Sequence, residues 1–233
     1  MGSQSKRFPV VTSATETLKQ SVERAQPPAE MLRAQLLLGY APILAAVWTP
    51  DGPYKLALML LSTVLILGIV ASGRYSWREM GLVLPSGRST AWIIGLGMVL
   101  AAAVPLAARA LGESALSNQL LQLHSAWQYV IWATVQEFIL QSFVFVRMES
   151  LLGGRRAVIA TAFLFSLAHI PSPVLTIGTF LGGLFFCEMF RRFRSIFPVG
   201  LAHALLGLTI AASFSNSILH HMRVGIGYLT YHS

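Results

Sequence analysis

AWQYVIWATVQEFILQSFVFV, residues 126–146, is an apolar stretch with one charged side chain, Glu137, close to its middle. A helix rises about 1.5 Å per residue, so the stretch is long enough to cross a hydrocarbon core of about 30 Å. An acid at that depth costs roughly 3 kcal/mol on insertion scales and is by default a candidate for a functional site. The stretch therefore predicts a membrane-spanning helix, and Glu137 is its candidate site residue.

The composition of the whole chain also indicates a protein that is surrounded by lipid. Hydrophobic residues make up 55% of the chain and charged residues 11%, whereas a soluble domain has about 25% charged residues. The formal net charge is +8, but the Lys and Arg residues lie between apolar runs and form no single stripe, so we expect no nucleic-acid partner. Cys187 is the single cysteine, which excludes an intrachain disulfide. The sequence predicts an integral membrane protein whose first partner is lipid.

Seven apolar stretches are long enough, or nearly so, to cross a membrane. They are residues 32–48, 54–72, 91–111, 126–146, 156–170, 173–190 and 196–214. Lipid offers no partner to exposed backbone groups, so these stretches predict helices and an all-α polytopic transmembrane bundle of about seven spans. The chain then divides into a polar N-terminal tail (1–31), N-terminal transmembrane helices (32–111), a core (126–214) and a C-terminal tail (215–233).

Basic residues alternate between the two sides of the predicted bundle. They fall in the N-terminal tail and in every second connection, as Arg74, Arg78, Arg88, Arg147, Arg155, Arg156, Arg191, Arg192 and Arg194. The intervening connections carry Asp51 and Glu113 and almost no Lys or Arg. By the positive-inside rule, this pattern predicts a cytoplasmic N-terminus and a C-terminus outside.

Two later stretches carry histidines: we expect His203 near the depth of Glu137, and His169, at the end of its stretch, closer to the outer face. Pro171 and Pro173 follow His169 and should end its helix in a sharp turn. The acid and the two imidazoles are therefore predicted to converge on a pocket that opens outward, although spacing alone does not make their helices neighbours. Each residue also has a simpler interpretation, as a hydrogen-bonding group between helices or at a helix end.

Other polar or small residues have structural interpretations. Glu188 precedes Arg191 and Arg192, which predicts an ion pair at the membrane interface. The small residues at 178, 182 and 183 predict close helix packing.

Three motifs resemble those of the CAAX protease and bacteriocin-processing (CPBP, Abi) family of intramembrane proteases. They are QEFILQ (136–141), FSLAH (165–169) and His203 in the last apolar stretch, and WREMGL (77–82) is similar to a short upstream element. The family patterns are Glu-Glu-x-x-x-Arg, Phe-x-x-x-His and His-x-x-x-Asn/Asp. This chain departs from them with Gln136, Gln141 and Gly207, as a divergent member would.

The resemblance covers residues 126–214, which it marks as a catalytic core, and implies an intramembrane endopeptidase acting on a peptide or membrane-protein substrate. It also implies a bacterial inner membrane. Peptide hydrolysis needs a base to activate water and a donor to hold the oxyanion. We expect Glu137 to be the base, with His169 and His203 orienting water and stabilising the oxyanion. Gln136 or Gln141 would add an amide donor, and Phe165 begins the second motif.

Two alternatives remain open from the sequence. Glu137, His169 and His203 are a familiar ligand set for catalytic zinc, but the two histidines are not four residues apart on one helix. The resemblance favours the reading without a metal or other cofactor. The second alternative is a non-catalytic peptide-binding, immunity or scaffold protein of the same fold, which Gln136 and Gly207 would suit.

Overall fold

The computed structural model describes residues 27–72, 75–113 and 123–231, which form helices and no strand. The elements are α2 (Ala29–Val47), α3 (Pro53–Ala71), α4 (Gly87–Ala110), α5 (Leu123–Glu137), the π-helix η1 (Phe138–Phe145), α6 (Val146–Leu152), α7 (Gly154–Leu167), α8 (Pro173–Phe193), α9 (Ile196–Ser213), α10 (Asn216–Leu219), the 3₁₀ turn η2 (His220–Met222) and α11 (Ile226–Leu229). The prediction of an all-helical protein is confirmed.

Six helical segments of the described chain are long and apolar enough to cross a membrane. The longest, residues 126–152, runs continuously through α5, η1 and α6. The stretch predicted at 156–170 is also helical, as α7, but it has only 14 residues and is about 21 Å long. The predicted count of about seven is therefore close, and the short segment is the one that ends beside Pro171.

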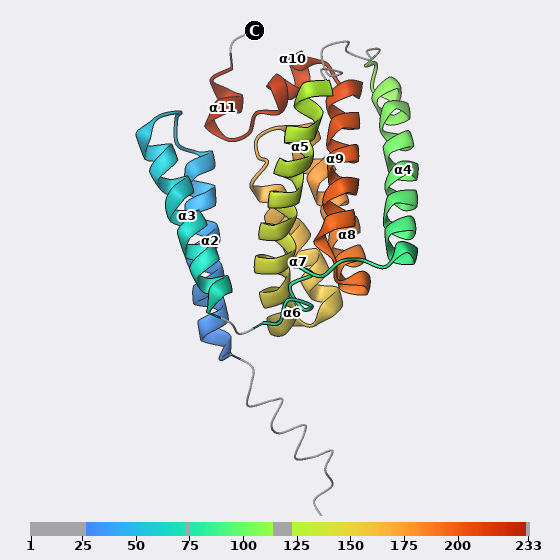
Figure 1. Cartoon of the computed structure of the whole chain (residues 1–233). Helices are drawn as coiled ribbons and strands as arrows, with labels where there is room; N and C mark the ends of the chain where they lie inside the picture. The colour runs from blue at the N-terminus through green and yellow to red at the C-terminus, as the bar shows by residue number, and fades with distance from the viewer. Residues whose placement is uncertain (1–26, 73–74, 114–122, 232–233) are drawn as a thin grey trace, which may run out of the picture.

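The helices form a bundle with an outlying hairpin on one side (Figure 1). The α5–η1–α6 rod contacts α7 and α9, and α7 packs along α8. On one side α4 packs against α9, and on the other the α2–α3 hairpin joins the bundle through α6 and η1. The central helices therefore have protein neighbours on several sides, and the outer three have few.

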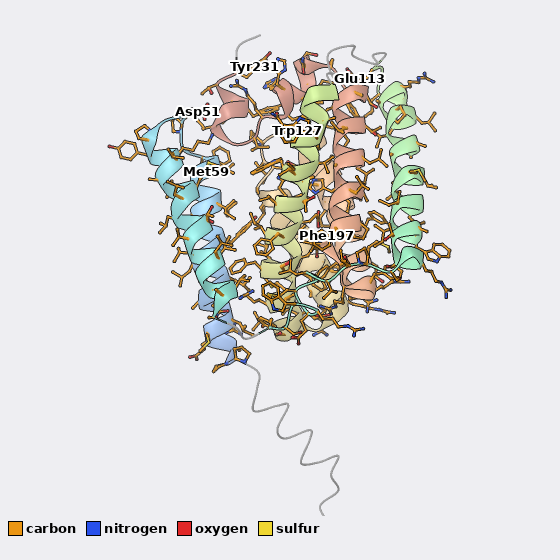
Figure 2. All side chains as sticks on the ribbon, viewed as in Figure 1. Asp51, Met59, Glu113, Trp127, Phe197 and Tyr231 are labelled. Carbon is orange, nitrogen blue, oxygen red and sulfur yellow. The ribbon has the colours of Figure 1, made fainter. Side chains whose placement is uncertain are left out.

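Central as well as outer helices present large apolar side chains to their surroundings. Met59 on α3 is 45% exposed, and Trp127 on α5 and Phe197 on α9 are exposed to a similar extent (Figure 2). In water such a surface would be unfavourable, but against acyl chains it costs nothing. This surface agrees with the integral membrane protein predicted from composition.

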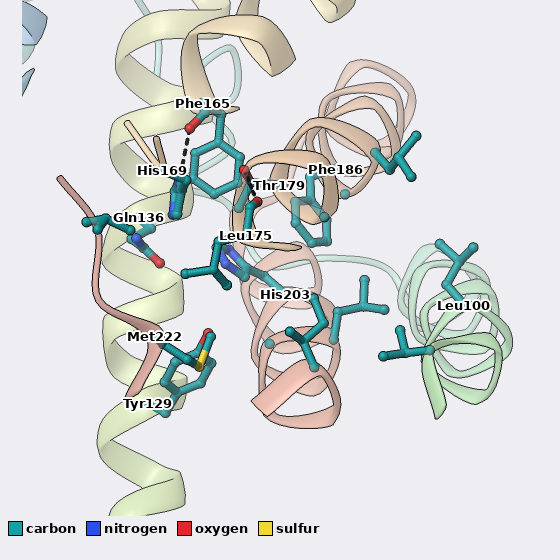
Figure 3. A pocket seen from close by; sticks show the side chains of 18 of the residues that line it. Leu100, Tyr129, Gln136, Phe165, His169, Leu175, Thr179, Phe186, His203 and Met222 are labelled. Carbon is teal, nitrogen blue, oxygen red and sulfur yellow. Dashed lines mark hydrogen bonds between the residues drawn. The ribbon is translucent and has the colours of Figure 1, made fainter. Parts of the chain in front are cut away.

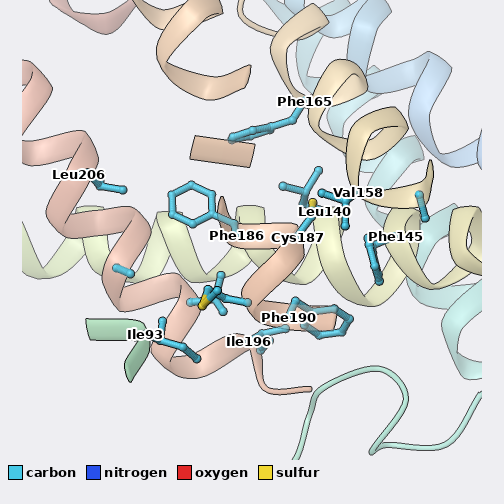
Figure 4. Packing of buried hydrophobic residues seen from close by; sticks show 14 of the residues in the cluster. Ile93, Leu140, Phe145, Val158, Phe165, Phe186, Cys187, Phe190, Ile196 and Leu206 are labelled. Atoms are coloured by element: carbon cyan, nitrogen blue, oxygen red, sulfur yellow. The ribbon is translucent and has the colours of Figure 1, made fainter. Parts of the chain in front are cut away.

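The largest buried cluster fills the space between η1, α7, α8 and α9 (Figure 4). Phe145 and Phe190 meet edge to face with ring centroids 5.6 Å apart. Helices α7 and α8 approach closely because Gly183 lies against Ala162, where an added Cβ would be 3.0 Å from the Ala162 Cα. The small-residue packing predicted for this part of α8 is confirmed at Gly183.

Ion pairs and backbone contacts tie together the end of the bundle that is predicted to be cytoplasmic. Glu188 pairs with Arg191 and Arg192, as predicted, and Arg194 pairs with Glu149 of α6. Residues 77–82 dock beneath η1, where the Ser142 hydroxyl donates to the Met80 carbonyl at 2.6 Å and the Ile196 amide donates to the Gly81 carbonyl. The upstream element of the sequence motif therefore supports the base of the central rod.

The C-terminal segment folds back over the opposite end of the bundle (Figure 1). Leu219 is buried there with Phe214 and Leu175. The Gly225 amide donates to the Ile170 carbonyl at 2.8 Å. Gly225 has a positive φ of 56° and lies so close to the Val47 carbonyl that a Cβ would overlap it, so only glycine fits. Residues 215–231 are thus part of the folded body.

Candidate active site

Glu137 is the last residue of α5, at the point where the helix widens into the π-helix η1. Short π-helical segments are rare and often mark functional sites. The side chain is fully buried, with no exposed area. Its Oε1 lies 2.8 Å from Nδ1 of His203, and its Oε2 accepts a hydrogen bond of 2.9 Å from Nε2 of Gln141. Both oxygens of this carboxyl group are therefore engaged.

Gln141 holds the carboxyl group from the next turn of the same rod. Its Nε2 also lies 3.6 Å from the Cys187 Sγ of α8. Its Oε1 is buried and has no hydrogen-bond partner among the described residues. An amide in this position binds the acid as a neutral partner, where the resembling family has an arginine.

His203 is fixed by aromatic rings as well as by Glu137. Its ring stacks on Phe186 of α8, with centroids 4.9 Å apart and planes 22° apart. The ring of Phe165 from α7 meets it edge to face at 5.6 Å. With Nδ1 directed at the carboxyl group, the other nitrogen, Nε2, has no hydrogen-bond partner among the described residues.

His169 comes from the turn after α7 and packs on the same phenylalanine. Its Nδ1 lies 2.8 Å from the Phe165 carbonyl, and the two rings meet edge to face at 4.8 Å. A carbonyl only accepts, so Nδ1 carries the proton. Because α7 is short and α8 begins at Pro173, this turn lies within the bundle. The phenylalanine of the Phe-x-x-x-His motif, Phe165, therefore packs against the imidazoles of both His169 and His203.

The two histidines line a cavity of about 500 Å³ (Figure 3). Its walls come from α4, α5, α8, α9 and the C-terminal segment, and they are mostly apolar. The helical portions that form it are the end of α4, the start of α8 and the later part of α9, so the cavity lies in the half of the bundle covered by the C-terminal segment. Gln136 lines this cavity, whereas Glu137 and Gln141 do not.

The structure brings the predicted residues together in a particular order. Glu137 and His203 are in direct contact, and His169 and Gln136 share the cavity with His203. The acid lies behind His203 as seen from the cavity. Sequence reasoning did not single out Tyr129, which lies on the cavity-lining face of α5 with Gln136, seven residues later. The spacing of two helical turns was the signal that would have found it.

The zinc alternative requires Glu137, His169 and His203 to be grouped as ligands. Within the described ranges, no three side chains of His, Cys, Asp or Glu are grouped to hold a metal ion. The carboxyl group of Glu137 faces Nδ1 of His203 at hydrogen-bond distance, so it serves as the partner of that imidazole.

The fold and site together define a class: a helical membrane protein with a carboxyl–imidazole pair and a second imidazole beside an apolar cavity. Residues 118–209 match the family model of Rce1-like, type II CAAX prenyl endopeptidases. This match confirms the resemblance to CAAX-type membrane proteases, and it covers the segment that supplies Glu137, His169 and His203. No curated protein and no solved structure matches the chain.

Proposed function

We propose that this protein is an intramembrane endopeptidase in which His203, supported by Glu137, activates water at the cavity wall. The observation that carries the proposal is the 2.8 Å contact between Glu137 Oε1 and His203 Nδ1, with the rest of the imidazole on the cavity. The family match of residues 118–209 supports protease activity of the CAAX type.

Glu137 selects the tautomer of His203. An ionised Glu137 accepts a hydrogen bond from Nδ1–H, which leaves the lone pair of Nε2 for the cavity. A carboxylate in this position orients the imidazole and stabilises the imidazolium that forms when Nε2 takes a proton. This differs from the sequence expectation, in which Glu137 itself takes the proton. The reason is that Glu137 has no exposed atom and uses both oxygens for hydrogen bonds.

His169 adds a second hydrogen-bond acceptor to the cavity. Its Nδ1–H donates to the Phe165 carbonyl, so its Nε2 is also an acceptor. The Nε2 atoms of His203 and His169 can therefore accept hydrogen bonds from the two O–H groups of a single water molecule in the cavity. A water held by His203 and His169 would present its oxygen lone pairs to a bound peptide carbonyl.

The reaction follows from these roles. The water oxygen attacks the carbonyl carbon while Nε2 of His203 takes one proton, and the negative charge moves to the carbonyl oxygen. Gln136, which lines the cavity, offers its amide N–H to that oxygen. Collapse of the intermediate breaks the C–N bond, and the imidazolium returns its proton to the leaving amine. The products are a carboxylic acid and an amine, so no other reactant is needed.

The cavity indicates the class of substrate. Its volume of about 500 Å³ and mostly apolar walls fit apolar side chains or a lipid-like group attached to a peptide. The matched family carries CAAX prenyl endopeptidase in its description, so a prenylated C-terminal peptide is the first probe. A peptide without the prenyl group but with the same sequence is its natural comparison.

The test uses the purified protein, residues 1–233, in lipid nanodiscs. It is incubated with the two CAAX peptides and with a proteome-derived peptide library, and new termini are identified by mass spectrometry. His203→Ala should slow product formation by at least about a hundredfold. His221→Ala is the control, because this histidine is exposed and lies outside the cavity lining. Absence of products from the wild type, or equal products from His203→Ala, would overturn the proposal.

A second candidate function is peptide binding without cleavage. The observation that favours it is the amide of Gln136, which lies on the cavity where the resembling family pattern has a glutamate. Binding of the same peptides can be followed by fluorescence anisotropy. Binding by the wild type without any product would establish this candidate in place of the protease.

A further inference from the structure

Tyr129 and Gly207 are in direct contact at the wall of the cavity. Gly207 lies one turn after His203 on α9, and Tyr129 lies near the start of α5. Both line the cavity. A Cβ added to Gly207 would overlap the Tyr129 hydroxyl oxygen and lie 2.7 Å from the adjacent ring carbon. The phenol therefore occupies the space that a side chain at position 207 would need.

The hydroxyl of Tyr129 is a polar group without a partner in an apolar wall. It makes no hydrogen bond to any residue that the structure describes. Tyr129 is half-buried, so its hydroxyl is accessible to a molecule in the cavity. Figure 3 shows Tyr129 at the same cavity as His203 and Gln136. A bound ligand with an acceptor oxygen would satisfy this donor.

The position of the hydroxyl relative to His203 suits such a ligand. Side chains four residues apart on a helix have Cβ atoms about 5–6 Å apart, so position 207 borders the space in front of His203. The resembling family pattern has Asn or Asp at this position, and this chain has glycine. Position 207 therefore supplies no polar side chain from α9, and the phenol of Tyr129 on α5 occupies that space.

We propose that Tyr129 is a catalytic residue whose hydroxyl donates a hydrogen bond to the carbonyl oxygen of the scissile peptide, and that Gly207 is required to admit it. This inference rests on the proposed protease function and adds a second donor beside Gln136. The proton stays on the phenol throughout. Because the donor acts on charge that develops during attack, its loss should lower kcat and leave KM nearly unchanged.

The experiment compares single and paired substitutions with the peptide that the wild type cleaves best. Tyr129→Phe removes only the hydroxyl and should lower kcat by about a hundredfold. Tyr54→Phe is the control, because Tyr54 is 80% exposed at the start of α3. Tyr129→Ala combined with Gly207→Asn frees the space and supplies an amide donor from α9. This pair should turn over substrate faster than Tyr129→Ala alone.

The outcomes separate the two proposals. If the wild type cleaves and Tyr129→Phe keeps kcat within twofold, the role of Tyr129 is overturned and the protease function stands. If Tyr129→Phe raises KM alone, the phenol binds substrate and is not an oxyanion donor, which also overturns the role. If the wild type cleaves nothing, both proposals fail together.

Discussion

At the scale of single residues, the exchange of Glu137 for glutamine tests the carboxyl–imidazole pair without emptying its space. In Glu137→Gln the remaining oxygen can still accept from His203, and the new amide can donate to Gln141 after that side chain flips. The flip is favourable because the Oε1 of Gln141 has no partner in the described structure. The fold should therefore survive the substitution.

Activity should not survive it. The variant loses the charge that stabilises the imidazolium, so we expect kcat to fall by roughly 10³–10⁴-fold. Thermal denaturation in detergent, measured in parallel, should give a midpoint close to that of the wild type. Glu30→Gln is the matched control, because Glu30 is exposed at the start of α2. Turnover of Glu137→Gln at the wild-type rate would remove Glu137 from the mechanism.

At this scale the sequence predicted that Glu137 and His203 lie together, but not which residues of the candidate site face the cavity. Glu137 and His203 stand out because ionisable groups are expensive in lipid, and they are in contact. The sequence could not decide which of Gln136 and Glu137 faces the cavity, since neighbours on a helix differ by about 100° in direction. A π-helix that begins at Phe138 has no sequence signature that would have fixed this direction.

At the scale of elements, the contact between α7 and α8 positions the turn that carries His169. Gly183→Val would force these helices apart, because its Cβ would lie 3.0 Å from the Ala162 Cα and 3.1 Å from the Ala162 Cβ. Overpacking of this kind costs typically about 1–3 kcal/mol. We expect a lower denaturation midpoint and reduced activity. Gly95→Val is the control, since nothing lies within 4 Å of a Cβ there. Equal midpoints for the two variants would contradict this packing.

The helices themselves were predictable because long apolar runs leave few alternatives in lipid. The C-terminal boundary of α7 was harder to predict. The apolar stretch was expected to be helical over residues 156–170, but the helix ends at Leu167. Two prolines nearby showed that a sharp turn had to follow. They could not show that the turn lies inside the bundle, which depends on packing between α7 and α8.

At the scale of the whole molecule, the alternation of basic connections predicts which end faces the cytoplasm. Single cysteines test this prediction with a membrane-impermeant maleimide, because Cys187 is fully buried and gives no background. Ser217→Cys, on the end covered by the C-terminal segment, should react in intact cells. Ser72→Cys, at the end of α3, should react only after the membrane is opened. The reverse pattern would invert the orientation.

The backbone contact between Gly225 and Ile170 has a practical consequence for handling this protein. It joins the C-terminal segment to the residue after His169, a candidate site residue, and the same glycine touches the end of α2. An affinity tag fused after Ser233 would strain the hydrogen bond between Gly225 and Ile170. Purification handles belong at the other terminus, where Ala29 begins its helix at the far end of the bundle.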